Sequence, residues 1–197
     1  MNSLSATQIP SSYVLSQVRQ MVPLAHVGSV YLFQGESQIL RLAMQELIDR
    51  FAMQGPVQVI VGGNRISFDH LPLILGEQLG SVYEIMDRIL VSRAEVCYQM
   101  QDVLAALAPS PTPIVITDML ESFYEEDLAL QEVSFLLQKC LRRIHELSET
   151  APVLIGASGD PSRPSLLEAL ERNSDERFYF QPFADSEGIV QPRFSGM

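Results

Sequence analysis

The strongest structural signal in the chain lies in residues 28–53, which read GSVYLFQGESQILRLAMQELIDRFAM. Residues 30–33 form a short, apolar, β-prone run, which predicts a buried strand. Gly35 then marks a turn. From Ser37 to Met53 the apolar side chains recur at the helical period, which predicts a helix. A strand that leads directly into a helix is the unit from which α/β proteins are built.

The rest of the chain repeats this alternation of strand and helix patterns. The expected strands are residues 30–33, 57–61, 88–91, 114–117, 153–155 and 177–181. The expected helices are residues 37–53, 69–80, 94–107, 127–148 and 165–172. Because the strands are unbroken apolar runs, we predict an α/β fold with a mostly parallel sheet and helices on both faces. We also expect strands 30–33 and 114–117 to be central neighbours.

The length of 197 residues, 47% of them hydrophobic, is enough for one sizeable core. We expect a core domain over residues 28–182, preceded by an N-terminal segment, residues 1–27, and followed by a flexible tail, residues 183–197. No apolar run reaches the ~18 residues that a membrane helix needs. The start of the chain is also unlike a secretion signal. These features predict a cytoplasmic protein that does not enter membranes.

Charge and residue usage argue against several classes of function. The net charge is −11, and Lys and Arg form no run longer than Arg142-Arg143. Because DNA binding depends on neutralising phosphates, we expect no strong DNA binding by this chain alone. Three scattered histidines and two distant cysteines, Cys97 and Cys140, provide no metal-ligand spacing. We therefore expect no metal and no cofactor.

Three predicted strands share features with one protein family. Residues 28–36 read GSVYLFQGE, residues 89–94 read ILVSRA and are followed by Gln99, and residues 113–118 read PIVITD. In this order and spacing the segments resemble the RecA/RadA recombinase superfamily, over residues 28–182. The resemblance implies the RecA-like core of the P-loop NTPase fold. It also implies that residues 113–118, an apolar strand ending in Asp, correspond to the family's Walker B strand.

The chain departs from this family where ATP would bind. A phosphate loop has the pattern G-x-x-x-x-G-K-[ST], in which backbone N–H groups and the Lys hold the phosphates. Here Gly35-Glu36 passes directly into Ser37, and no Lys precedes Lys139. The family's catalytic Glu is replaced by Gly62-Gly63-Asn64. The resemblance therefore predicts a degenerate Walker A motif without nucleotide-binding capacity. Its relic positions are Gly35, Glu36, Ser37 and Asp118.

Two of these residues have alternative interpretations. Asp118 would hold Mg²⁺ in the family, but a strand-end Asp also commonly stabilises a turn. Ser37 follows Gly35 and Glu36 as a hydrolase nucleophile would, and Ser37, Asp118 and His145 occur in the chain order of the α/β-hydrolase triad. Against a hydrolase, Ile39 occupies the place of that motif's second Gly, and His145 falls inside a predicted helix.

The N-terminal segment carries a short apolar stripe at helical spacing. The stripe consists of Val14, Leu15, Val18 and Met21. A helix this short is unstable in isolation, so the stripe must pack either on its own core or on a partner. In the recombinases the segment before the core packs on the adjacent subunit, and we therefore expect these four residues to bind a partner.

Two hypotheses about function follow from these features. The first is a non-catalytic, RecA-like pseudo-ATPase that acts as an interaction or accessory subunit in DNA recombination, DNA repair or regulation. Such a subunit would dock on a RecA-like ATPase, on an adaptor or on a second copy of itself. The alternative is an enzyme with a non-standard site, either a weak nucleotide hydrolase or a small serine hydrolase that uses Ser37.

Overall fold

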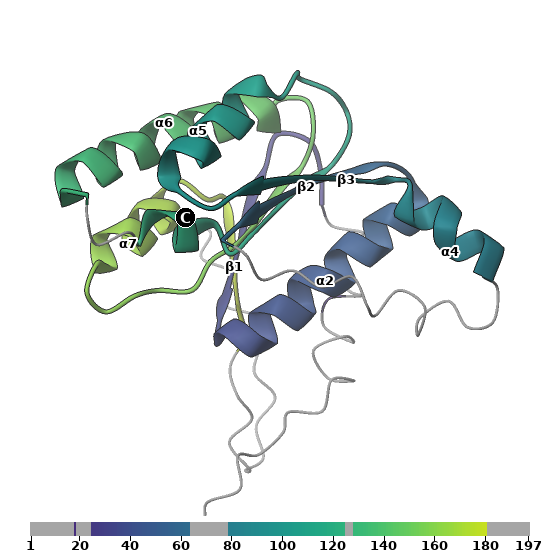
Figure 1. The fold of residues 1–197 in the computed structure, drawn as a ribbon, viewed down its shortest axis with the longest axis horizontal. Coiled ribbons are helices and arrows are strands. Elements are labelled where there is room, and N and C mark those ends of the chain that lie inside the picture. The colour runs from purple at the N-terminus through teal and green to yellow at the C-terminus, as the bar shows by residue number, and fades with distance from the viewer. Residues whose placement is uncertain (1–17, 19–24, 64–78, 125–127, 181–197) are drawn as a thin grey trace, which may run out of the picture.

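The architecture is a parallel sheet between two layers of helices (Figure 1). The computed structural model describes residue 18 and residues 25–63, 79–124 and 128–180. The sheet has six strands, and all five strand pairs are parallel. This result confirms the predicted α/β fold with helices on both faces of a parallel sheet.

Strands and helices alternate along the described chain. The strands are β1 (Val30–Gly35), β2 (Val57–Gly62), β3 (Ile89–Ala94), β4 (Ile114–Thr117), β5 (Val153–Gly156) and β6 (Glu176–Phe180). The helices are α2 (Ser37–Gln54), α4 (Leu79–Met86), α5 (Cys97–Ala106), α6 (Leu130–Ser148) and α7 (Pro164–Arg172), with the 3₁₀ helix η2 (Met119–Phe123) after β4.

The strands lie in the order β3-β2-β4-β5-β1-β6. The prediction that β1 and β4 are neighbours is therefore wrong, because β5 lies between them. Ile155 of β5 is in register with Leu32 of β1 on one side and with Ile116 of β4 on the other. The α2 connection crosses from β1 to β2 and leaves a space that β4 and β5 later fill. Both β1 and β4 are nevertheless interior strands, as expected.

The two faces of the sheet are covered by different helices. Successive residues of a strand point to opposite faces, so Leu32 packs in the core beneath α5, α6 and α7, whereas Tyr31 and Phe33 pack on the side of α2. Figure 1 shows α5, α6 and α7 on one side of the sheet and α2 with α4 on the other. Phe33 of β1 also stacks on Phe178 of β6, with ring centroids 5.1 Å apart.

Element boundaries around β3 differ from the prediction. β3 extends to Ala94, beyond its predicted end, because its pairing with β2 continues to the pair Gly62↔Ala94. Helix α5 consequently begins later than predicted, at Cys97. The predicted helix 69–80 falls almost entirely in residues 64–78, which lie outside the described residues, as does the predicted tail 183–197.

Candidate functional site

The carboxyl ends of β1 and β5 form the position where a parallel sheet of this kind binds ligands. Helix α2 follows β1 on one face of the sheet, and α7 follows the neighbouring strand β5 on the other face. Ligands bind in the crevice where connections diverge in this way. Phe33 and Gly156, near the ends of the two strands, are in register. The candidate site is therefore the crevice at these two strand ends.

The junction between β1 and α2 consists of one residue. β1 ends at Gly35 and α2 begins at Ser37, so Glu36 is the N-cap, with extended backbone (φ −61°, ψ 136°) and no capping hydrogen bond from its side chain. A Cβ on Gly35 would lie 2.5 Å from the carbonyl oxygen of Phe180 in β6. The close approach of β6 thus requires glycine. Residues 35–37 form no loop in which backbone N–H groups could surround a phosphate.

A hydrogen-bond network spans the crevice. Ser37 Oγ donates to Ser158 Oγ at 3.4 Å, and Ser158 Oγ donates to the Gly35 carbonyl oxygen at 3.3 Å. The Tyr124 hydroxyl donates to the Ser158 carbonyl oxygen at 2.8 Å and accepts from the Asp160 N–H at 3.0 Å. Burial raises the pKa of Tyr124 to about 12, so this hydroxyl remains a donor at neutral pH. The Ser37 hydroxyl at the start of α2 is therefore linked through Ser158 to the loops that follow β4 and β5.

Asp118 occupies the turn after β4. It is buried and has left-handed backbone (φ 48°, ψ 39°), a conformation that Asp adopts more readily than most residues. Its carbonyl oxygen accepts from the Glu121 N–H at 3.0 Å and packs directly against Gly62, where a Cβ would lie well under 3.0 Å away. This geometry matches the turn interpretation of Asp118. Within the described residues, no three His, Cys, Asp or Glu side chains could share a metal ion.

An acidic hollow borders the crevice on the side of α7. It has a volume of about 310 Å³, and its lining includes Asp160, Glu168 and Glu171. The N–H and the hydroxyl of Ser162 each donate to Asp160 Oδ1 at 2.6 Å, and these bonds lower the pKa of that carboxyl. Asp160 is therefore ionised at neutral pH. The negative charge along this hollow would repel a phosphate group.

Arg163 and Arg172 flank this acidic hollow in sequence, and Arg172 Nη1 lies 3.7 Å from Glu168 Oε2. Arg163 is committed to backbone contacts. Its guanidinium donates to the carbonyl oxygens of Phe123, at 3.1 Å, and Leu128, at 3.3 Å. These bonds tie the loop after β5 to both sides of the segment that leads into α6. The guanidinium N–H groups of Arg163 are thus directed to backbone carbonyl oxygens.

A second polar cluster joins β1, β6 and α7. Glu171 Oε1 accepts from Gln34 Nε2 and from the Tyr179 hydroxyl, each at 2.9 Å. Burial, followed by the bond to Glu171, raises the pKa of Tyr179. Gln34 is only 2% exposed, and its Oε1 has no hydrogen-bond partner among the described residues. The cluster therefore joins β1 and β6 to α7.

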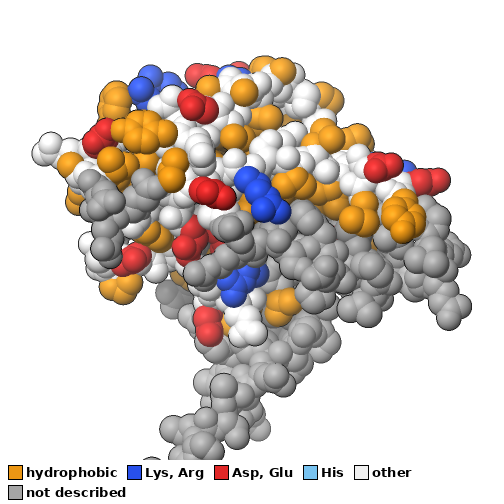
Figure 2. Space-filling view, in the orientation of Figure 1, with side chains coloured by type: hydrophobic (Ala, Val, Ile, Leu, Met, Phe, Trp, Pro, Cys, Tyr) orange, Lys and Arg blue, Asp and Glu red, His pale blue; other side chains and the backbone are white. Residues whose placement is uncertain are grey.

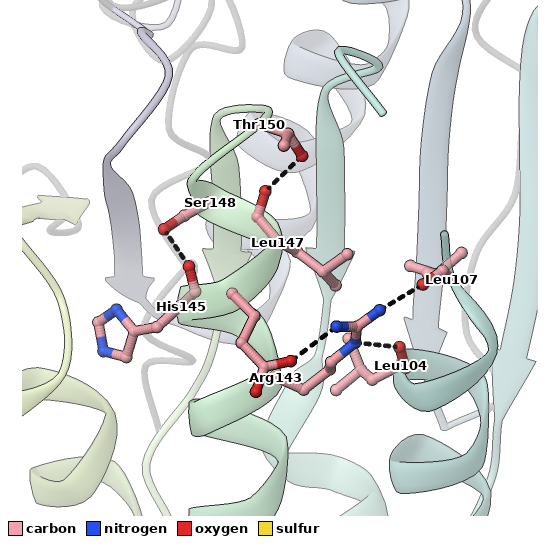
Figure 3. Close-up of polar contacts among 8 residues, drawn as sticks. Leu104, Leu107, Arg143, His145, Leu147, Ser148 and Thr150 are labelled. Atoms are coloured by element: carbon pink, nitrogen blue, oxygen red, sulfur yellow. Dashed lines mark hydrogen bonds and ion pairs between the residues drawn. The ribbon is translucent and has the colours of Figure 1, made fainter. Parts of the chain in front are cut away.

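The hydrolase triad is not assembled. His145 lies in the last turn of α6, beside Ser148, whose hydroxyl donates to the His145 carbonyl oxygen at 2.8 Å (Figure 3). The Ser148 carbonyl oxygen accepts from the Gly28 N–H at 2.7 Å, immediately before β1 begins. His145 therefore lies at the amino edge of the sheet. Ser37 and Asp118 lie at the carboxyl edge, across the full length of the strands.

The predicted partner-binding stripe is described at one residue. Val18 is fully buried and belongs to the hydrophobic cluster on the α2 face, with Tyr31 and Phe33 among its members. Val14, Leu15 and Met21 lie outside the described residues. Val18 thus packs on the core of its own chain, and a partner-binding role for the stripe stays a prediction.

The sequence did not connect Ser158 with Ser37, or Glu171 with Gln34. Ser158 and Glu171 are more than 120 residues from their partners Ser37 and Gln34, so no local spacing connects them. The one available signal was Gln34 itself, a polar residue at the end of an apolar strand. Such a residue is commonly held by a hydrogen bond when it is buried.

No protein-family model matches the chain, and no curated protein is significantly similar to it. Within the described residues, no helix combines the length and the apolar character needed to cross a bilayer.

Proposed function

We propose that this protein is a non-catalytic, RecA-like pseudo-ATPase that acts as an interaction or accessory subunit. The observation that carries the proposal is the single-residue junction between β1 and α2. A phosphate loop needs several residues between strand and helix, with a second Gly and a Lys. Here Gly35 is pressed against β6 and Ser37 is bonded to Ser158, so the α2 N-terminus has neither the space nor the cation for a triphosphate.

Charge supports the same conclusion. Glu36 stands at the positive end of α2, where a negative charge is favourable. The neighbouring hollow adds Asp160, Glu168 and Glu171. The phosphates of a nucleotide bound at this end of α2 would approach Glu36 and these three carboxylates.

The parallel α/β fold is compatible with the RecA-like core that the sequence resembles, and the resemblance is the basis for proposing recombination, repair or regulation as the setting. The enzyme alternative has less support. The separation of His145 from Ser37 removes the general base that a serine hydrolase would need. A weak nucleotide hydrolase would need the phosphate cradle that the β1–α2 junction lacks.

The test is thermal unfolding of the full chain with and without saturating ATP-Mg²⁺, followed by calorimetry. A ligand present at 100 times its Kd stabilises a protein by about 2.7 kcal/mol, which is a readily measured shift in melting temperature. We expect no shift with ATP, ADP or GTP. A micromolar or tighter Kd for ATP-Mg²⁺ would contradict the proposal.

Asp118→Ala is the matched variant for this test. If Asp118 holds a metal–nucleotide complex, the variant should lose any ligand-induced stabilisation that the parent shows. If Asp118 is a turn residue, the variant should be destabilised by about 1 kcal/mol, because Ala tolerates left-handed backbone less well than Asp. We expect the second result, with no change in response to ATP-Mg²⁺.

A further inference from the structure

The acidic hollow beside α7 is lined by apolar side chains as well as by carboxylates. It has a volume of about 310 Å³ and lies between α7 and the loop that follows β5. Its apolar side chains belong to Pro161, Pro164 and Leu167, and its carboxylates belong to Asp160, Glu168 and Glu171. Gly159 also lines the hollow, and a Cβ there would lie 2.8 Å from Leu167 Cδ2. The lack of a side chain at Gly159 therefore keeps this space open.

Two of these carboxylates are positioned by neutral donors. Asp160 Oδ1 accepts from the N–H and the hydroxyl of Ser162. Glu171 Oε1 accepts from Gln34 Nε2 and from the Tyr179 hydroxyl. Neither carboxylate forms an ion pair with a Lys, Arg or His side chain of the described residues. Both carboxylates are therefore held in place without a cationic partner in that part of the chain.

The stability of α7 does not explain its acidic residues. Glu171 lies in the last turn of α7, where the partial negative charge of the helix end makes a carboxylate unfavourable. Arg172 lies 3.7 Å from Glu168, but both side chains are more than half exposed, and such surface pairs contribute little. The acidic residues of this helix therefore favour a cation that comes from outside the chain.

A buried acceptor lies against one wall of the hollow. Gln34 is only 2% exposed, and the 2.9 Å bond from its Nε2 to Glu171 Oε1 directs its carboxamide to the carboxylate that lines the hollow. The Oε1 atom of Gln34 has no hydrogen-bond partner among the described residues. Buried acceptors without a partner are uncommon in folded proteins. A cationic donor bound beside Glu171 would supply the missing partner.

The lining of the hollow fits an arginine side chain better than a metal ion. Within the part of the chain that the structure describes, no three His, Cys, Asp or Glu side chains could share a metal ion. An arginine has an aliphatic stem that packs on apolar side chains and a planar guanidinium with five N–H donors for separated carboxylates. On the face that Figure 2 displays, acidic side chains lie among hydrophobic ones, and Lys and Arg form small separate groups. A free amino acid fits less well, because its own carboxylate would meet the acidic residues.

We propose that the acidic hollow binds an arginine side chain of a protein partner. This inference rests on the proposed function, because an accessory subunit needs a surface for its partner, and it adds the chemistry that the partner presents. Binding of ATP-Mg²⁺ tests the absence of a phosphate site at α2, whereas binding of an arginine compound tests the hollow. Either result can fail while the other holds, so the two failures are distinguishable.

Titration of the isotope-labelled full chain with N-acetyl-arginine amide, followed by NMR, tests the proposal. We expect saturable shifts of the backbone amides of Asp160, Leu167 and Glu171, with a millimolar Kd. The neutral N-acetyl-citrulline amide should give no saturable shift, because it has the same shape without the charge. Free arginine should bind more weakly than its acetylated amide. Tighter binding of free arginine would contradict a site for a side chain of a protein, and equal binding of the citrulline compound would contradict recognition of charge.

Amide variants of the two positioned carboxylates test the site itself. Glu171→Gln and Asp160→Asn should each weaken binding of N-acetyl-arginine amide about tenfold, because each removes one charged acceptor and keeps the size of the side chain. Asp102→Asn is the matched control, since Asp102 is exposed on α5 and its loss changes the net charge equally. That variant should keep the parent's Kd, and thermal unfolding checks that each variant is folded. Equal affinities of all the variants, or no saturable shift in the parent chain, would overturn the proposal.

Discussion

At the scale of single residues, the carboxyl edge is determined by close backbone approaches. Gly35 is the last residue of β1 and Gly62 the last of β2. At each, a Cβ would collide with a backbone carbonyl oxygen, that of Phe180 or that of Asp118. The two glycines are therefore packing requirements.

Gly62→Ala should be strongly destabilising. The added Cβ would meet the Asp118 carbonyl oxygen, a backbone atom that cannot move without displacing η2. We expect a loss of roughly 3 kcal/mol in the free energy of unfolding, measured by urea denaturation. Gly55→Ala is the matched control, because its backbone is extended and a Cβ there would meet nothing within 4 Å. Equal stabilities of the two variants would refute the collision at Gly62.

At the scale of whole elements, these helix ends are stabilised by contacts with other elements and not by capping side chains. Neither Glu36 at α2 nor Ala129 at α6 makes a side-chain capping bond. Arg143 instead joins two helices: Nε donates to the Leu104 carbonyl oxygen at 3.3 Å and Nη2 to the Leu107 carbonyl oxygen at 2.6 Å, as Figure 3 shows. These bonds satisfy carbonyl groups that the end of α5 would otherwise leave open.

Ala129→Ser should stabilise the protein by about 1 kcal/mol. Ala129 is exposed and extended (φ −62°, ψ 137°) at the N-cap of α6, and Glu132 is three residues later, so serine would complete a capping box. The measurement is the midpoint of urea unfolding. Ala105→Ser, at an exposed position inside α5, is the control, and there serine should destabilise by a few tenths of a kcal/mol. A gain at both positions would mean that capping is not the cause.

At the scale of the whole molecule, stability should fall at alkaline pH. Burial raises the pKa of the Cys140 thiol to about 12 from its ordinary value of 9.0. Between these values the unfolded chain loses the thiol proton and the folded chain keeps it, so the free energy of unfolding decreases as pH rises. Below about pH 9 this thiol has no effect on the pH dependence.

Cys140→Ala should therefore reduce the pH dependence. We expect the loss of stability between about pH 7.5 and pH 10.5 to be smaller by roughly 2 kcal/mol than in the parent, from about 1.4 kcal/mol per pH unit. Val133→Ala removes a side chain equally buried on the same helix and should keep the parent's slope. Urea denaturation at the two pH values measures both variants. Parallel slopes for all three proteins would show that Cys140 does not titrate in this range.

The elements of the fold could be predicted because apolar runs and helical periodicity are local. The run of residues 114–117 is recovered without change as β4. Strand order could not be predicted, because β5 enters between β1 and β4 through crossovers whose lengths do not specify how many strands they span. The position of Ser37 at the carboxyl edge of the sheet follows from its place directly after β1. Its contact with Ser158, which follows β5, depends on the strand order and could not be predicted.

The position of β1 between β5 and β6 also has a consequence for biosynthesis. A ribosome adds residues at roughly 5–20 per second, so roughly 6–30 s pass between completion of β1 at residue 35 and delivery of the strands that flank it, residues 153–180. During translation Tyr31 and Phe33 have neither a strand on either side nor the aromatic rings of β6 to stack on. The nascent chain is therefore expected to stay a client of ribosome-associated chaperones until its final segment emerges.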